Sequence, residues 1–101
     1  MGQTGPEKVP DVIKAHSVVI VDEAGVGRAT LAAGSKGTGL ILTDPNGKLR
    51  AVLSAAPNGA GLQLTDGDGY TRIMALVGSN ANGVSSITLS DKDGKAIWKA
   101  P

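Results

Sequence analysis

The sequence contains no cysteine and no phenylalanine, and its only aromatic residues are Tyr70 and Trp98. Without cysteine, the chain has neither a disulfide to staple a small fold nor a thiolate for metal binding or catalysis. Without more aromatic rings, its core must be built from leucine, isoleucine, valine and alanine, which bury less area per residue. A chain of 101 residues forms at most one domain. Because the predicted core is small, we expect the chain to associate with itself.

The sequence also lacks an imbalance of charge, since ten Lys and Arg residues stand against nine Asp and Glu residues. Proteins that bind nucleic acid or a membrane surface need concentrated positive charge, so neither partner is predicted. The longest apolar run is too short to span a bilayer, and no charged-then-apolar leader precedes a cleavage site. We therefore expect a soluble chain without membrane insertion, and the sequence does not indicate its compartment.

Catalytic constellations are missing as well. His16 is the only histidine, and a catalytic histidine needs a partner and an orienting group, so we interpret it as a solvated residue before the first strand. No serine lies in a Gly-x-Ser-x-Gly elbow, and "GVGRAT" (25–30) lacks the third glycine of a dinucleotide fingerprint. Paired carboxylates such as Asp66 and Asp68 lie in one turn, whereas a glycosidase needs them across a cleft. The sequence predicts neither an enzyme nor a cofactor.

What the sequence does contain is a tandem repeat. Its four copies are "VVIVDEAGVGRATL" (18–31), "LILTDPNGKLRAVL" (40–53), "LQLTDGDGYTRIMAL" (62–76) and a shorter "ITLSDKDGKAIW" (87–98). Three columns stay in phase at spacings of 22, 22 and 25 residues: Asp22, Asp44, Asp66 and Asp91; Gly25, Gly47, Gly69 and Gly94; and Arg28, Arg50 and Arg72. Because chance rarely keeps three columns in phase, we interpret the copies as one repeated supersecondary unit.

Each Asp-x-x-Gly segment has the composition of a type I turn closed by a left-handed glycine. In the second copy, Pro45 fixes φ, Asn46 tolerates the third turn position, and Gly47 adopts a positive φ after Asp44. A calcium loop of the EF-hand kind needs ligands at alternate positions, a glycine at the sixth and a glutamate at the twelfth. Here the glycine comes fourth, so the sequence predicts turns and no metal site.

The segments that flank each turn read as short strands. "LILT" and "LQLT" alternate around leucines, and turn signals recur every eight to twelve residues. We predict an all-β chain of seven or eight short antiparallel strands in a meander. The preferred register sets Leu42 opposite Leu49 and Leu40 opposite Ala51, whereas a three-residue bulged loop sets Leu42 opposite Arg50. Whether each turn closes a hairpin or forms a corner between the faces of a prism stays open at this point.

The tandem pattern "LxLxDxxGxxRAxL", led in by "VIKAHSVVIVDEAG" and closed by "IWKAP", resembles a group of bacterial proteins of unassigned function that are built of such β-repeats. The resemblance covers residues 12–101, which we assign to a single β-repeat domain, and leaves residues 1–11 as a flexible lead-in. The chain departs from the pattern at two positions. Gln63 lies on the first strand of its unit, and Ile97 stands where arginine is expected. The resemblance implies an extendable fold rather than an enzyme scaffold, and it implies no catalytic residue.

Two functions remain open. A meander with one apolar face and two exposed edges is not tolerated alone in water. We therefore predict a homotrimeric β-prism or intertwined β-helix, with a dimeric β-sandwich or a small barrel as the alternative. Such an oligomer indicates a structural or interaction module, namely a stalk, spike or adaptor. In that arrangement Trp98 either caps the last unit or anchors a partner.

The second function is a ligand-binding module. In it, the row Arg28, Arg50 and Arg72, or the turn loops, would hold an anion or a glycan. The simpler interpretation of the same row is that each arginine pairs with an aspartate of its own or a neighbouring unit.

Overall fold

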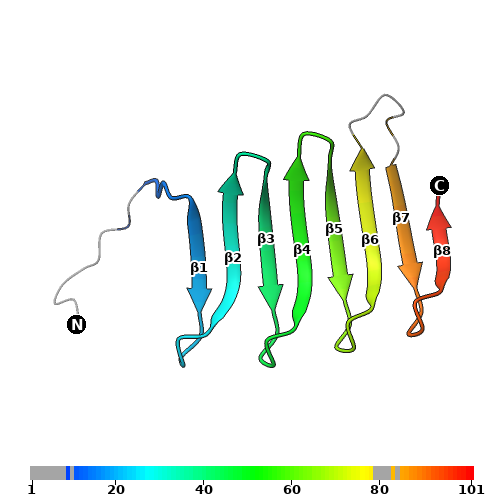
Figure 1. Cartoon of the computed structure of the whole chain (residues 1–101), viewed down its shortest axis with the longest axis horizontal. Helices are drawn as coiled ribbons and strands as arrows, with labels where there is room; N and C mark the ends of the chain where they lie inside the picture. Colours follow the sequence, from blue (N-terminus) through cyan, green and yellow to red (C-terminus); the bar gives the residue numbers. More distant parts are fainter. Residues whose placement is uncertain (1–8, 10, 79–82, 84) are drawn as a thin grey trace.

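The chain forms one antiparallel sheet of eight strands, in which every strand pairs with its neighbours in the sequence (Figure 1). The computed structural model describes residues 9, 11–78, 83 and 85–101. The strands are β1 (Ser17–Val21), β2 (Gly27–Gly34), β3 (Gly37–Thr43), β4 (Leu49–Ala56), β5 (Gly59–Thr65), β6 (Thr71–Gly78), β7 (Ser85–Ser90) and β8 (Ala96–Ala100). The described residues contain no helix, which confirms the predicted all-β meander. Apart from residues 9 and 11, the predicted lead-in (1–11) lies outside the described residues.

The sheet is open. Its order runs from β1 to β8, and these two strands form its edges rather than pairing with each other. A small barrel formed by one chain, one of the predicted alternatives, is therefore wrong. Each Asp-x-x-Gly segment closes a hairpin between two paired strands, and all four hairpins lie at the same end of the sheet, which is the lower end in Figure 1. This settles the choice between hairpins and corners for the turns themselves.

The preferred register was wrong. Leu42 lies opposite Ala51 and Leu40 opposite Leu53, while Leu49 lies opposite Thr43. The Asp44 N–H donates to the Lys48 carbonyl oxygen at 2.9 Å, which leaves a loop of three residues. Gly47 closes this loop at a φ of 80°, and its N–H donates to the Asp44 carbonyl oxygen.

A three-residue loop alone would place Leu42 opposite Arg50, on the same face of the sheet. Instead the register shifts between Leu42 and Thr43, so that one extra residue of β4 is accommodated as a bulge. The shift returns the next apolar residue, Ala51, to the leucine face and leaves Arg50 on the other. The same shift occurs beside the other three turns, between Ile20 and Val21, Leu64 and Thr65, and Leu89 and Ser90.

The resulting pairs align side chains into three rows across one face, because alternate residues of a strand share a face. The turn-side row is Ile20, Ala29, Leu42, Ala51, Leu64, Ile73, Leu89 and Trp98; the central row is Val18, Leu31, Leu40, Leu53, Leu62, Ala75, Ile87 and Ala100; the far row is Ala33, Thr38, Ala55, Ala60, Val77 and Ser85. None of these residues is charged. We call this surface the apolar face.

The other surface, which we call the mixed face, carries both polar and apolar side chains, for example Thr30, Ile41, Val52 and Gln63 across four strands. The arginines of the repeat also belong to this face. Nothing covers either face, and no residue is buried in the part of the chain that the structure describes. Leu53, in the middle of the apolar face, is 54% exposed. A sheet normally buries its apolar face against another layer, and this sheet has none of its own.

Replacing Gly47 tests the turn geometry. Gly47→Val forces a β-branched side chain into a positive φ, and we expect the free energy of unfolding to fall by about 1–3 kcal/mol. The matched control is Gly67→Ala in the next turn, where a Cβ atom meets nothing within 4 Å and φ is not positive. That control should change stability by less than about 0.5 kcal/mol. Denaturant unfolding at one fixed protein concentration measures both, and equal losses would contradict the assigned turn.

Candidate functional site

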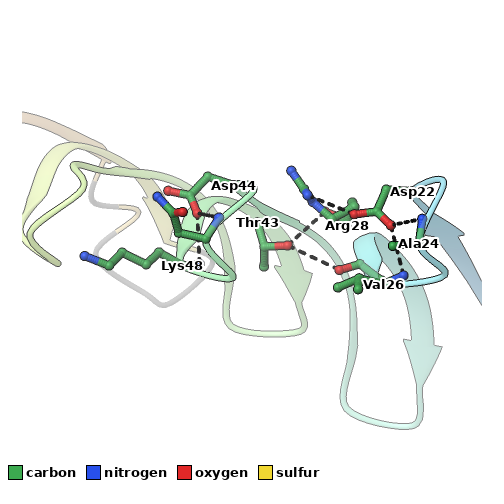
Figure 2. Close-up of polar contacts among 9 residues, drawn as sticks. Asp22, Ala24, Val26, Arg28, Thr43, Asp44 and Lys48 are labelled. Atoms are coloured by element: carbon green, nitrogen blue, oxygen red, sulfur yellow. Dashed lines mark hydrogen bonds and ion pairs between the residues drawn. The ribbon is translucent and has the colours of Figure 1, made fainter.

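The turn aspartates use one carboxylate oxygen to hold their own loop (Figure 2). Asp44 Oδ1 accepts the backbone N–H groups of Asn46 at 2.8 Å and Lys48 at 3.1 Å. Asp22, Asp66 and Asp91 accept the equivalent pairs of N–H groups, at distances between 2.9 and 3.1 Å. These hydrogen bonds replace the backbone pairing that a strand would supply, so the carboxylates shape the turns.

The second carboxylate oxygen pairs with the arginine of the same unit. Asp22 Oδ2 lies 3.2 Å from Arg28 NH1, Asp44 Oδ2 lies 3.2 Å from Arg50 NH1, and Asp66 Oδ2 lies 3.5 Å from Arg72 NH1. The bulge beside each turn places the guanidinium on the mixed face, within reach of the carboxylate. The structure therefore brings the three arginines into one row at the turn end of the sheet, each beside its own aspartate.

Two of these arginines also reach the following unit. Arg50 Nε donates to the Thr65 carbonyl oxygen at 2.7 Å, and Arg72 Nε donates to the Ser90 carbonyl oxygen at 2.7 Å. Each of these side chains thus ties its own turn to the end of the next odd-numbered strand. Sequence reasoning missed this link, because it depends on a register that the sequence pattern does not determine.

The first unit differs at this link. Arg28 Nε is buried and has no hydrogen-bond partner. Thr43 occupies the position in the second unit that Thr65 occupies in the third. Its hydroxyl Oγ1 donates to the carbonyl oxygens of Arg28 at 3.3 Å and Gly27 at 3.5 Å (Figure 2). The side-chain hydrogen bond between the first two units is therefore donated by a threonine hydroxyl rather than by a guanidinium.

The hydrogen bonds within the turns also lower the pKa of three of the turn aspartates. The pKa of Asp22, Asp44 and Asp66 is lowered from the ordinary value of 3.8, mainly by the N–H of the residue four positions on. Partial desolvation opposes this shift, while the second turn N–H and the paired arginine reinforce it. At neutral pH each guanidinium therefore lies beside an ionised carboxylate, which repels a second anion.

A hollow of about 340 Å³ lies beside the third turn, lined in part by Lys48, Gln63, Thr65 and Asp66. Three of the polar side chains that line it, those of Lys48, Gln63 and Asp66, already have partners within the chain. Lys48 Nζ donates to the Gly67 carbonyl oxygen at 2.6 Å, and Gln63 Nε2 donates to Thr71 Oγ1 at 2.8 Å. Gln63, which departs from the repeat pattern, thus joins β5 to β6 across the mixed face. The hollow holds no convergent set of free polar groups that would define a ligand.

The described residues contain no group of three or more His, Cys, Asp or Glu side chains that could hold a metal ion. His16 contributes its carbonyl oxygen to Ala33 N–H at 3.0 Å, which extends the pairing of β1 with β2. Over the same described residues, no helix is long and apolar enough to cross a membrane.

Comparisons with models of protein families, with curated proteins and with solved structures find no match to this chain.

Substitutions of Asp44 separate its turn contacts from its ion pair. Asp44→Asn keeps an Oδ1 acceptor for the two loop N–H groups and removes the charge beside Arg50, whereas Asp44→Ala removes both. We expect Asp44→Ala to destabilise the chain more than Asp44→Asn, and both to destabilise it less than Gly47→Val. Denaturant unfolding gives this order. If Asp44→Ala were the most damaging of the three, the carboxylate would be holding more than its own turn.

The lowered pKa values predict how stability depends on pH. Since the unfolded chain binds protons at a higher pH than the folded chain, the unfolding free energy rises with pH across this range. The contribution of Asp22, Asp44 and Asp66 is fully present above their ordinary value of 3.8 and is lost as the pH falls through the lowered folded-state values. Unfolding curves from about pH 6 to about pH 2 measure the loss. The triple Asp→Asn variant should flatten the curve, and an unchanged slope would contradict the assignment.

Proposed function

We propose that the chain is a non-catalytic structural module that works as a homo-oligomer, a segment of a stalk, spike or adaptor built by packing the apolar faces of several copies together. One observation carries the proposal: an eight-stranded sheet presents three uncharged rows on one face, and nothing in the described chain covers them. Exposed apolar surface of this extent normally marks an interaction site.

The area of the apolar face supports a stable interface. Eight strands spaced about 4.8 Å apart and about 20 Å long present a face of about 770 Å². Stable protein interfaces bury about 800 Å² on each partner. Another copy of the chain has an uncharged face of the same size, which is exposed to water in the same way. Packing the two faces together would remove the apolar surface of both copies from water.

Three copies fit the side chains better than two. Consider three sheets, each about 20 Å wide, that form the sides of a triangular prism. The middle of each sheet then lies about 6 Å from the common axis, and neighbouring sheets converge at the corners. The central row carries mostly large residues, such as Leu31, Leu40, Leu53 and Leu62, which would reach the axis. The far row carries mostly small residues, which suit a narrow corner. A flat sandwich keeps its sheets about 10 Å apart throughout and has no such need for one small row.

The Arg–Asp row supports the same function. On the mixed face, Arg50 and Arg72 connect successive units, so the sheet is held together on the side that faces water. Binding of an anion by Arg28, Arg50 and Arg72, the alternative function, has less support because each guanidinium already has a carboxylate partner.

Solution mass tests the proposal directly. Light scattering should give about three times the chain mass of 10.1 kDa. Leu53→Lys places an unpaired charge in the centre of the apolar face and should convert the oligomer to monomer or unfolded chain. The matched control is Ile41→Lys on the mixed face, where the native side chain is 41% exposed, and this variant should keep the oligomer mass. A stable, cooperatively unfolding 10.1 kDa particle would contradict the proposal.

A further inference from the structure

The outer rows of the apolar face differ in side-chain size. The turn-side row carries Leu42, Leu64 and Leu89 on the odd-numbered strands β3, β5 and β7. The far row carries Thr38, Ala60 and Ser85 on those same three strands. Each of these strands therefore presents a large apolar side chain near its turn end and a small side chain near its other end.

The small far row leaves a hollow of about 350 Å³ on the apolar face. Its lining combines the central-row leucines Leu31, Leu40 and Leu53 with the far-row residues Thr38, Ala55 and Ala60. The lining is almost wholly apolar, so water in the hollow gains few hydrogen bonds there. An apolar side chain from outside would restore the contacts that the lining atoms lack.

Symmetry specifies which side chain from another copy reaches the hollow. Rotation about a three-fold axis preserves the sense in which equivalent strands run around that axis, so each corner of a prism brings the turn end of one sheet against the far end of the next. Such a contact is heterologous, and it closes into a ring. Because the sheets converge at a corner, a large side chain there needs a small one opposite it.

We propose that Leu42 and Leu64 of one copy insert into the hollow formed by Thr38, Ala55 and Ala60 of the next copy, so that the turn-side row and the far row form the contact between copies. This inference rests on the proposed self-association and specifies its geometry. None of the residues in either row is charged. On β3 and β5 a large residue of the turn-side row and a small residue of the far row lie four positions apart on the same strand: Leu42 with Thr38, and Leu64 with Ala60.

Disulfide trapping tests this contact cleanly, because the chain contains no cysteine. Leu64→Cys and Ala60→Cys are prepared as single variants, and a 1:1 mixture is refolded together and oxidised. Two cysteines bond only when their Cβ atoms lie about 3.5–4.5 Å apart. We expect a covalent pair of chains in the mixture and none in either variant alone. The double variant Leu64→Cys/Ala60→Cys should give a covalently closed ring of three chains.

Three further measurements make each result decisive. Ile41→Cys on the mixed face sets the level of random oxidation, and the pair Leu42→Cys with Thr38→Cys repeats the test at a second strand. Cross-linking of Leu64→Cys with itself would overturn the inference, because turn-side rows would then face each other. The absence of cross-links at both strands would also overturn it. Light scattering of the unmodified chain separates these results from failure of the proposed function, which a monomer mass would show.

A ring of two chains from the double variant would be a different result. It would support the contact between the turn-side and far rows, and it would overturn the three-fold arrangement.

Discussion

The single extra residue beside each turn determines which side chains share a face. The Gly47 loop holds three residues, and a three-residue loop without further adjustment would place Arg50 on the face of Leu42. The bulge between Leu42 and Thr43 prevents this, and it recurs in all four hairpins. The separation of an uncharged face from a face that carries the arginines depends on this one local irregularity. A bulge lost from one unit would place a charge among the leucines of that unit.

The same bulge brings the arginine to its aspartate. One aspartate carboxylate accepts two loop N–H groups through one oxygen and pairs with a guanidinium through the other, so the turn and the ion pair are parts of one local structure. Exposed ion pairs contribute little individually. The links from Arg50 and Arg72 to the next strand have a different role, because they join successive units in addition to the ladder hydrogen bonds. Lys48 makes a further link of this kind through its bond to the Gly67 carbonyl oxygen.

The sequence predicted the elements of the fold better than their pairing. The Asp and Gly columns placed all four turns, and the alternation of leucines placed the strands and the apolar face. The register was wrong because sliding one strand by two residues leaves every side chain on the same face, so alternation cannot distinguish Leu42 opposite Leu49 from Leu42 opposite Ala51. Contacts that cross between strands, such as Gln63 with Thr71, depend on that register and could not be predicted without it.

The structure offers a physical explanation for the absence of the repeat's arginine from the fourth unit. Arg50 and Arg72 each donate Nε to a carbonyl oxygen in the following strand. Ile97 occupies the equivalent position on β8, which is an edge of the described sheet, so the described sheet has no neighbouring strand beyond it whose carbonyl oxygen a guanidinium there could reach. Each added unit brings two strands, one turn and one bulge, and leaves both the apolar face and the direction of the edge strand unchanged. In the proposed oligomer the interface between copies would lie along the face rather than at the edges, so the length of such a module could vary with the number of units while the contact between copies stayed the same.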